Sequence, residues 1–305
     1  MNLFSNGQDV GKRREAFKVA LAAPEIARLP GAFSPLIARS IEEAGFEGVY
    51  VSGAVVAADL ALPDIGLTTL TEVAYRARQI ARVTELGVLV DADTGFGEPM
   101  SAARTVSELE DAGVAGCHLE DQVNPKRCGH LDGKEVVPTE LMVRRIRAAV
   151  SARRDPNFVI CARTDAAGIE GIDAAIERAR AYLHAGADMI FPEALHTEED
   201  FRYFRAALPE AWLLANMTEF GKTTLLSAEL LEDIGYNAVI YPVTTLRIAM
   251  GQVEQALAEI KEHGTQEGWL DRMQHRSRLY ELLRYEDYNV FDQNIFTYKK
   301  GADDA

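Results

Sequence analysis

Short apolar segments alternate with helical segments along most of the chain, and this alternation limits the possible folds more than any other feature. Apolar runs bounded by glycine are typical of strands that are buried on both faces. A weak first run and seven clear ones are interpreted as strands: 26–33, 48–52, 87–91, 115–120, 158–163, 188–191, 212–216 and 238–241. About eight strand–helix units favour a closed (β/α)8 barrel, with an open, doubly wound sheet as the alternative.

Helical spacing of apolar residues fills the intervals between these strands. The expected helices cover 71–84, 102–112, 139–152, 172–185 and 227–234. Several helices end in Ala-Gly just before a strand, at Gly45, Gly113 and Gly186, where a left-handed glycine stops the helix. We therefore expect one barrel domain, 1–305, in which residues 265–305 form a C-terminal helical extension.

The acidic balance of the chain excludes several kinds of partner. With a net charge of −15, the chain lacks the basic surface that nucleic acid or an anionic membrane requires. No apolar run approaches the roughly 20 residues that span a bilayer. The basic cluster at Lys12 precedes an interrupted apolar stretch, which favours a helix leading into the fold over a signal peptide. Three cysteines without a framework spacing indicate free thiols in a reducing compartment, so we expect a cytoplasmic protein.

Polar residues follow the predicted strands at their carboxyl ends, where barrel enzymes build their active sites. Asp91 and Asp93 lie two residues apart at one strand end, and Glu120 and Glu193 end two other strands. Carboxylates gathered in this way suit a hard divalent ion such as Mg²⁺, which takes one or two carboxylates and keeps several waters. The alternative is that the two aspartates only cap helices or loops, but the polar ends of the other strands favour the metal site.

A basic segment carries one of the three cysteines. Cys128 lies beside Lys126, Arg127 and His130, and neighbouring cations favour a reactive thiolate. Cys117 and Cys161 fall inside predicted strands and are interpreted as inert core residues. His118 also lies in a strand, where a buried core histidine is as good an interpretation as a ligand.

Three arginines are candidates for binding substrate carboxylates, because the guanidinium fork matches a carboxylate. Arg163 is the strongest because it ends a strand, and Arg247 and Arg276 are the other two. A small polyanionic substrate is therefore compatible with the negative net charge, since arginines act locally inside a cleft.

These motifs resemble the isocitrate lyase and phosphoenolpyruvate mutase superfamily. Residues 126–130 resemble its cysteine-loop motif. The branch that cleaves 2-methylisocitrate is the most similar, through residues 90–97, 118–122, 162–165, 191–194 and 215–221. The resemblance runs from about Pro30 to Tyr285 without a large gap.

The resemblance implies a role for each matching position. Asp91 and Asp93 correspond to metal-associated aspartates, and Asp64 and Glu120 to the outer shell of Mg²⁺, for which Mn²⁺ can substitute. The implied catalytic residues are Cys128, as the acid, with Tyr50, Arg163 and Glu120; Tyr50 matches a tyrosine discussed as the base. The implied substrate-binding residues are Ser52, Gly53, Ala54, Cys128, Gly129, Arg163, Glu193, Asn216, Met217, Thr218, Arg247 and Arg276. The superfamily commonly has Ser-Gly-Gly where this chain has Ser52, Gly53 and Ala54, and alanine resists a positive φ.

The implied reaction is a Mg²⁺-dependent retro-aldol cleavage of 2-methylisocitrate to succinate and pyruvate, as in propionate breakdown by the methylcitrate cycle. The rivals are isocitrate cleavage, cleavage of another substituted malate, and phosphonopyruvate-type mutase or hydrolase chemistry. The chain lacks the insertion of typical isocitrate lyases, and Phe191 and Pro192 make one wall more apolar; the cysteine loop argues against the mutases. A non-catalytic barrel is disfavoured because every expected polar position is filled.

The C-terminal extension is rich in aromatic residues, including Tyr285, Tyr288, Phe291 and Phe296. An apolar tail that follows a complete barrel packs either on its own barrel or on a neighbouring subunit. The resemblance implies the second arrangement, a homotetramer of paired dimers that exchange C-terminal helices.

Overall fold

A computed structural model of the chain describes residues 9–127 and 133–297. Its eight strands are β1 (Ala27–Pro30), β2 (Gly48–Val51), β3 (Gly87–Asp91), β4 (Gly116–Glu120), β5 (Val159–Thr164), β6 (Met189–Pro192), β7 (Trp212–Asn216) and β8 (Ala238–Tyr241). All pairings are parallel, in the order β1-β8-β7-β6-β5-β4-β3-β2. A bridge between Gly31 and Tyr50 joins the two edges, so the sheet is a nearly closed barrel. The predicted (β/α)8 architecture is confirmed, and the open sheet is excluded.

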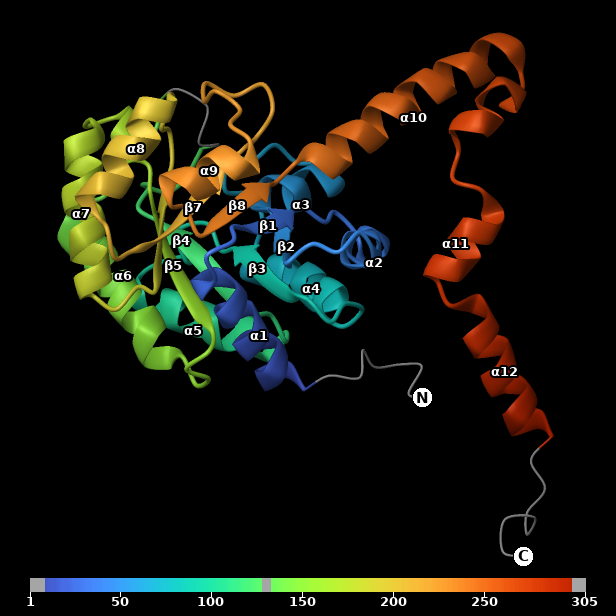
Figure 1. Cartoon of the computed structure of the whole chain (residues 1–305), viewed down its shortest axis with the longest axis horizontal. Coiled ribbons are helices and arrows are strands. Elements are labelled where there is room, and N and C mark those ends of the chain that lie inside the picture. Colours follow the sequence, from blue (N-terminus) through green and yellow to red (C-terminus); the bar gives the residue numbers. More distant parts are fainter. Residues whose placement is uncertain (1–8, 128–132, 298–305) are drawn as a thin grey trace, which may run out of the picture. The chain divides into compact units, whose positions relative to one another are not determined.

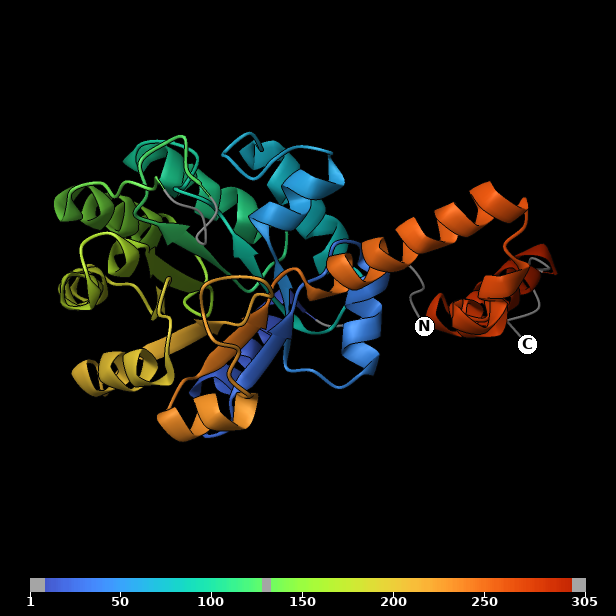
Figure 2. The same cartoon turned by 90° about the horizontal axis from the view of Figure 1, so that it is seen from above.

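Helices surround the strands (Figures 1 and 2). They are α2 (Pro35–Glu43), α3 (Gly53–Asp59), α4 (Leu70–Ala81), α5 (Pro99–Asp111), α6 (Thr139–Ala152), α7 (Ile172–His184), α8 (Glu198–Ala207) and α9 (Ala228–Ile234), with a short 3-10 turn η1 (Ala166–Gly168). Local signals set their ends: Thr69 and Thr197 form capping boxes at the starts of α4 and α8. The predicted glycine stops are confirmed at Gly45, Gly113 and Gly186, each with a positive φ.

The two faces of the strands serve different cores. Val49, Val88 and Cys117 belong to the large cluster between sheet and helices, whereas Leu89 and Cys161 belong to the barrel interior. This follows from the two-residue period of a strand, which sends successive side chains to opposite faces. Because Cys117 and Cys161 are fully buried, the prediction that they are core residues is confirmed.

Helix α1 (Val10–Ala22) covers the amino ends of the strands. Its Phe17 packs in the interior cluster, so close to Gly87 that a Cβ at that glycine would lie 2.4 Å from the Phe17 ring. Arg13 and Arg14 donate to loop carbonyls, among them Thr84 and Val114. The carboxyl ends of the strands are thereby left as the face on which a site can form.

The described residues up to Ile248 form one compact unit, and those from Ala249 onward form a second. Helix α10 (Thr244–His263) continues from the first into the second, which further contains η2 (Glu267–Arg272), α11 (Arg276–Leu282) and α12 (Tyr285–Phe296). Many apolar side chains of the second unit are exposed: Val253, Leu257, Leu270, Leu283, Val290, Phe291, Ile295 and Phe296. No helix among the described residues is long and apolar enough to cross a membrane.

Candidate active site

The register of the barrel brings polar side chains from three neighbouring strands, β3, β4 and β5, to its carboxyl end. Asp91 pairs with His118 across β3 and β4, and Glu120 pairs with Arg163 across β4 and β5. Arg163 in turn pairs with Phe191 on β6. All five side chains are buried, and their interior position follows from the alternation that places Leu89 and Cys161 inside the barrel. The ring of polar groups expected at the strand ends is therefore present.

The carboxylates of Asp91 and Asp93 both lie next to Gly53. The alternation of side chains along a strand does not explain this, because Asp93 lies beyond the end of β3. Strand β3 ends at Asp91, and Asp93 lies beyond it with a left-handed backbone at φ 46°, which aspartate tolerates. The Gly53 N–H donates to Asp91 Oδ2 at 3.1 Å. A Cβ on Gly53 would lie 3.0 Å from Asp91 Oδ2 and 3.2 Å from Asp93 Oδ1, so the missing side chain lets both carboxylates approach the start of α3.

The geometry of the turn at residues 52–54 suits alanine. Ser52 is the N-cap of α3, and Ala54 is its second residue. Ala54 is not among the residues with positive φ. The glycine that is common in the superfamily is therefore not needed here for backbone reasons.

Lys126, the first residue of the cysteine-loop motif at residues 126–130, contacts two of the acids that the resemblance assigns to a metal site. Its ammonium forms an ion pair with Asp64 and lies 2.8 Å from Asp93 Oδ1. Burial lowers the pKa of Lys126, but the surrounding carboxylates, Asp93 foremost, outweigh it, so this lysine stays protonated. The side chain of Lys126 is therefore held inside the site.

Negative charge exceeds positive charge around the acids. Burial raises the pKa of Asp93 to about 6, helped by the nearby carboxylates of Asp91 and Asp64. Burial also raises the pKa of Glu120 well above its usual range. Burial opposes ionisation of Asp91 as well, but His118, Lys126 and Arg163 overcome it and lower the pKa of that carboxyl. Such shifts mark a place where added positive charge is stabilising.

A divalent ion fits this donor set. The buried Oε1 of Glu120 has no hydrogen-bond partner within the described ranges, and hard carboxylate oxygens are what Mg²⁺ prefers. Within the described residues no three His, Cys, Asp or Glu side chains converge as a ready-made ligand group. Because Mg²⁺ takes one or two carboxylates and completes its shell with water and substrate, the two carboxylates of Asp91 and Asp93 would be enough to hold it.

Tyr50 and His118 form a buried pair inside the barrel. The Tyr50 hydroxyl lies 2.7 Å from Nε2 of His118, and the two rings stack with centroids 5.8 Å apart. Burial lowers the pKa of His118 to about 4, so its imidazole is neutral. Burial, followed by the charge of Asp91, raises the pKa of Tyr50 well above its usual range. The surroundings of Tyr50 therefore favour the neutral phenol over the phenolate that a general base requires.

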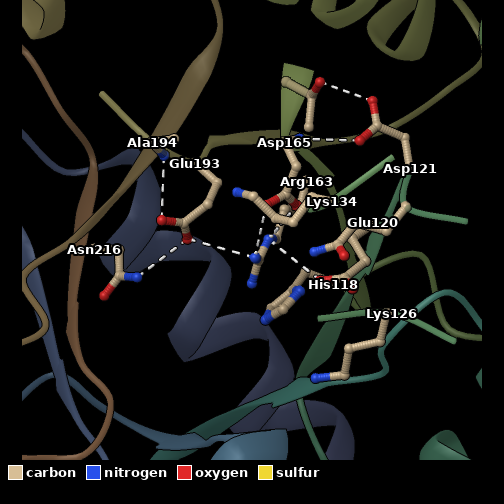
Figure 3. A network of polar contacts seen from close by, with 12 residues as sticks. His118, Glu120, Asp121, Lys126, Lys134, Arg163, Asp165, Glu193, Ala194 and Asn216 are labelled. Carbon is tan, nitrogen blue, oxygen red and sulfur yellow. Dashed lines mark hydrogen bonds and ion pairs between the residues drawn. The ribbon is translucent and has the colours of Figure 1, made fainter. Parts of the chain in front are cut away.

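Arg163 lies among three carboxylates (Figure 3). Its Nε is 2.9 Å from Asp165 Oδ2 and 3.3 Å from Glu120 Oε2, and its Nη2 is 3.7 Å from Glu193 Oε2. Asn216 donates to the same Glu193 oxygen at 3.1 Å. The guanidinium also lies over the ring of Phe191, 5.1 Å from its centroid. This cluster can bind the carboxylate and hydroxyl groups of a substrate through one cation and several acceptors.

The other expected residues fall into three groups. Tyr50, Ser52, Ala54, Asp64, Asp91, Arg163, Glu193, Asn216 and Thr218 line one cavity at the carboxyl ends of the strands. The Met217 side chain belongs to the outer core instead, and Arg247 at the start of α10 pairs with Glu219. Arg276 begins α11 in the second unit, and Cys128 and Gly129 lie outside the described residues.

A larger cavity of about 660 Å³ is lined in part by Asp93. Hydroxyl side chains of Thr68, Thr69, Thr71 and Ser101 contribute to its lining, and a Thr94–Asn124 hydrogen bond lies at its border. Of the predicted site residues that the structure describes, Asp93 alone lines it. Most of the predicted site residues that the structure describes therefore lie at the smaller cavity.

Sequence reasoning did not assign Lys126, Lys134 or Asp165 a role in this cluster. Lys134 pairs with Asp165 at 2.8 Å, and both side chains are almost fully buried. The sequence signal for Asp165 was its place directly after β5, two residues beyond Arg163. Nothing in the pattern around Lys134 indicated a buried ion pair.

The fold and the site together define the class: a (β/α)8-barrel protein with a carboxylate-rich, arginine-containing site for a small anionic ligand at the carboxyl ends of its strands. The family model described as phosphoenolpyruvate phosphomutase matches residues 17–261. The chain therefore belongs to the phosphoenolpyruvate mutase/isocitrate lyase superfamily.

Three relatives illustrate the range of this superfamily. A protein of Corynebacterium glutamicum named probable 2-methylisocitrate lyase 1 is 91% identical, over 99% of both chains. The crystal structure of 2,3-dimethylmalate lyase is similar with a TM-score of 0.87 and 34% identity, over 95% of this chain and 98% of that one. A phosphonopyruvate hydrolase solved with oxalate and Mg²⁺ has a TM-score of 0.84 and 27% identity, over 93% of this chain and 99% of that one.

Proposed function

We propose that this chain is a carbon–carbon lyase that cleaves 2-methylisocitrate to succinate and pyruvate. The observation that carries the proposal is the 91% identity, over nearly the full length of both chains, to a protein named as a probable lyase of that substrate. The acid-lined cavity with Arg163, Glu193 and Asn216 supports it, because a tricarboxylate needs both cationic and hydrogen-bonding partners.

The cleavage breaks the bond between the carbinol carbon and its neighbour. A basic group of the site accepts the hydroxyl proton, the carbinol carbon becomes the keto carbon of pyruvate, and the electron pair of the broken bond passes to the carbon next to a carboxylate. That carbon then accepts a proton and becomes part of succinate. In the proposal Arg163 binds a substrate carboxylate, Tyr50 lies beside the reacting groups, and Cys128 donates the final proton.

Mg²⁺ is the proposed cofactor, with Mn²⁺ as a substitute, held at Asp91 and Asp93 with Asp64 and Glu120 in the outer shell. When bound, the ion supplies positive charge that stabilises the developing negative charge on the substrate oxygens. The hydrolase solved with oxalate and Mg²⁺ supports this choice within the superfamily. Chelator is expected to abolish turnover and Mg²⁺ to restore it, and full activity of Asp93→Ala in chelator would refute the metal assignment.

Cleavage of another substituted malate is the second candidate, favoured by the likeness to 2,3-dimethylmalate lyase. Phe191 lines the cavity and gives it an apolar wall that suits a methyl group. One methyl group is worth about 10- to 200-fold in specificity, so kcat/KM for 2-methylisocitrate, isocitrate and 2,3-dimethylmalate separates the candidates. Absence of pyruvate release from 2-methylisocitrate in the presence of Mg²⁺ would refute the first proposal.

A homotetramer of paired dimers, in the cytoplasm and serving propionate breakdown by the methylcitrate cycle, completes the proposal. The exposed apolar side chains of the second unit support association, because large apolar patches on a protein surface commonly mark interfaces with another chain. Leu257, Leu283 and Phe296 are examples, with exposed fractions of 60%, 43% and 90%.

A further inference from the structure

The Arg163 guanidinium is held along one edge by a residue that the proposed reaction does not use. Asp165 accepts from Nε of Arg163 at 2.9 Å through Oδ2 and from Nη2 at 3.1 Å through Oδ1. This is the two-bond, fork-to-fork geometry that fixes both the plane and the direction of a guanidinium. Among residues 9–127 and 133–297, Nε and Nη2 have carboxylate partners and the remaining nitrogen, Nη1, has none, while Phe191 lies against one face of the guanidinium plane.

Asp165 is itself held from behind by a rigid set of contacts. Its backbone N–H donates to Asp121 Oδ1 at 2.9 Å. The other Asp121 oxygen accepts from the hydroxyls of Thr164 and Tyr182, each at 2.7 Å. Asp121, Thr164 and Asp165 are fully buried, so the Asp165 carboxylate cannot turn out into solvent.

Lys134, which follows the cysteine-loop motif in the sequence, completes the arrangement (Figure 3). Its ammonium is 2.8 Å from Asp165 Oδ1, the oxygen that also accepts from Arg163 Nη2. Burial raises the pKa of Asp165, but Arg163 and Lys134 outweigh it and lower that pKa below its usual range. Two cations thus keep a fully buried carboxylate ionised.

We propose that Asp165, supported by Lys134, is a positioning residue that orients Arg163 so that its Nη1 edge faces the substrate carboxylate. This inference rests on the proposed function, because the substrate carboxylate is taken to be one of 2-methylisocitrate. It differs from a purely structural role, because a structural ion pair would affect the stability of the barrel and leave substrate binding unchanged.

The test is Asp165→Asn, which keeps the side-chain volume and removes the charge. The NH₂ group of the new asparagine is a donor and would face a guanidinium N–H, which is also a donor, so one of the two hydrogen bonds to Arg163 is lost. For 2-methylisocitrate with saturating Mg²⁺, KM is expected to rise about 10- to 100-fold, the scale of one charge-assisted hydrogen bond. We expect kcat to stay within about threefold, because a carboxylate held equally in the ground and transition states affects binding alone.

Lys134→Met is the second variant, and it leaves the Arg163–Asp165 pair in place. We expect a smaller increase in KM, about three- to tenfold, because the shared Oδ1 loses one partner while Arg163 keeps both bonds. If KM in both variants stays within twofold of the parent, the inference is wrong. A loss confined to kcat in Asp165→Asn would also overturn it, because it would place Asp165 in the chemistry.

Asp188→Asn is the matched control. Asp188 also pairs with an arginine, Arg153 at 2.5 Å, but it lies just before β6, at the amino ends of the strands. Loss of this pair is expected to reduce thermal stability and to leave KM unchanged. A KM that rises equally in the control would show that loss of any barrel ion pair produces the effect.

A measurement that needs no turnover separates this inference from the proposed function. In the parent, ¹⁵N NMR should show a slowly exchanging Arg163 Nε proton, assigned by its loss in Arg163→Lys, and Asp165→Asn should make that exchange fast. A parent that does not cleave 2-methylisocitrate would refute the proposed function alone. Fast exchange of the Nε proton in the parent would refute the inference, whatever the substrate.

Discussion

Gly53→Ala tests whether the start of α3 sets the spacing of the metal-associated acids. The added Cβ would lie 3.0 Å from Asp91 Oδ2 and 3.2 Å from Asp93 Oδ1. Ordinary contacts begin near 3.4 Å, so the two oxygens must retreat by about 0.4 and 0.2 Å (3.4 − 3.0 and 3.4 − 3.2). Mg²⁺ demands nearly ideal geometry at roughly 2.0–2.1 Å, so shifts of this size matter.

Changes next to metal ligands typically cost about 10- to 100-fold in metal affinity, and we expect a loss of that size. The assay is isothermal titration of Mg²⁺, followed by the Mg²⁺ dependence of pyruvate release. Gly251→Ala is the control, because its Cβ would meet no described atom within 4 Å. A Mg²⁺ affinity of Gly53→Ala within twofold of the parent would refute the reasoning, since the carboxylates would then not be constrained by this turn.

Four further predictions concern other parts of the molecule. Cys128→Ser is expected to lose about 10²–10⁴-fold in kcat with little change in KM, as for loss of a general acid, and a kcat within threefold of the parent would remove Cys128 from the mechanism. Alkylation of the native protein should modify Cys128 alone and inactivate it, because burial raises the pKa of Cys117 to about 12 and that of Cys161 well above its usual range. The folded state holds His118 neutral with a pKa of about 4 against 6.5 when unfolded, so its contribution to stability is present above pH 6.5 and is lost as pH falls toward 4. That contribution is at most about 3 kcal/mol, and urea unfolding of the parent and His118→Gln at pH 7 and 5 should show the extra slope in the parent alone. Light scattering should show a tetramer at micromolar concentration, and a monomer would contradict the proposed exchange of C-terminal helices.

The barrel could be predicted from local pattern alone. A strand buried on both faces must be apolar throughout, and a helix that covers it must be apolar on one side. These demands produced the runs at 87–91 and 158–163 and the glycine stop at Gly113, all close to their observed places. The strand-end positions of Asp91, Glu120 and Arg163 followed for the same reason, because the direction of a parallel strand determines which end carries the site.

The resemblance contributed what periodicity could not. The sequence pattern gave Asn216 and Thr218 no more than a place at or just beyond the end of a strand, and their roles came from matching motifs. The resemblance also raised the question whether Ala54 could adopt the backbone conformation of the glycine that is common there. The structure answers it, because Ala54 lies in helix α3 and has no positive φ. Motif matching compares residue types, whereas backbone conformation depends on where the following helix begins.

Tertiary structure decided which charges meet. Lys126 and Asp64 are 62 positions apart, and Tyr50 and His118 are 68 apart, so no local pattern could pair them. The same holds for Lys134, whose ammonium meets Asp165 only because the segment after the cysteine motif returns to β5. Burial then changed the chemistry of these groups, keeping His118 neutral and Asp165 ionised. A sequence specifies which side chains can ionise, but desolvation and the partners that the fold brings within a few ångströms determine whether they do.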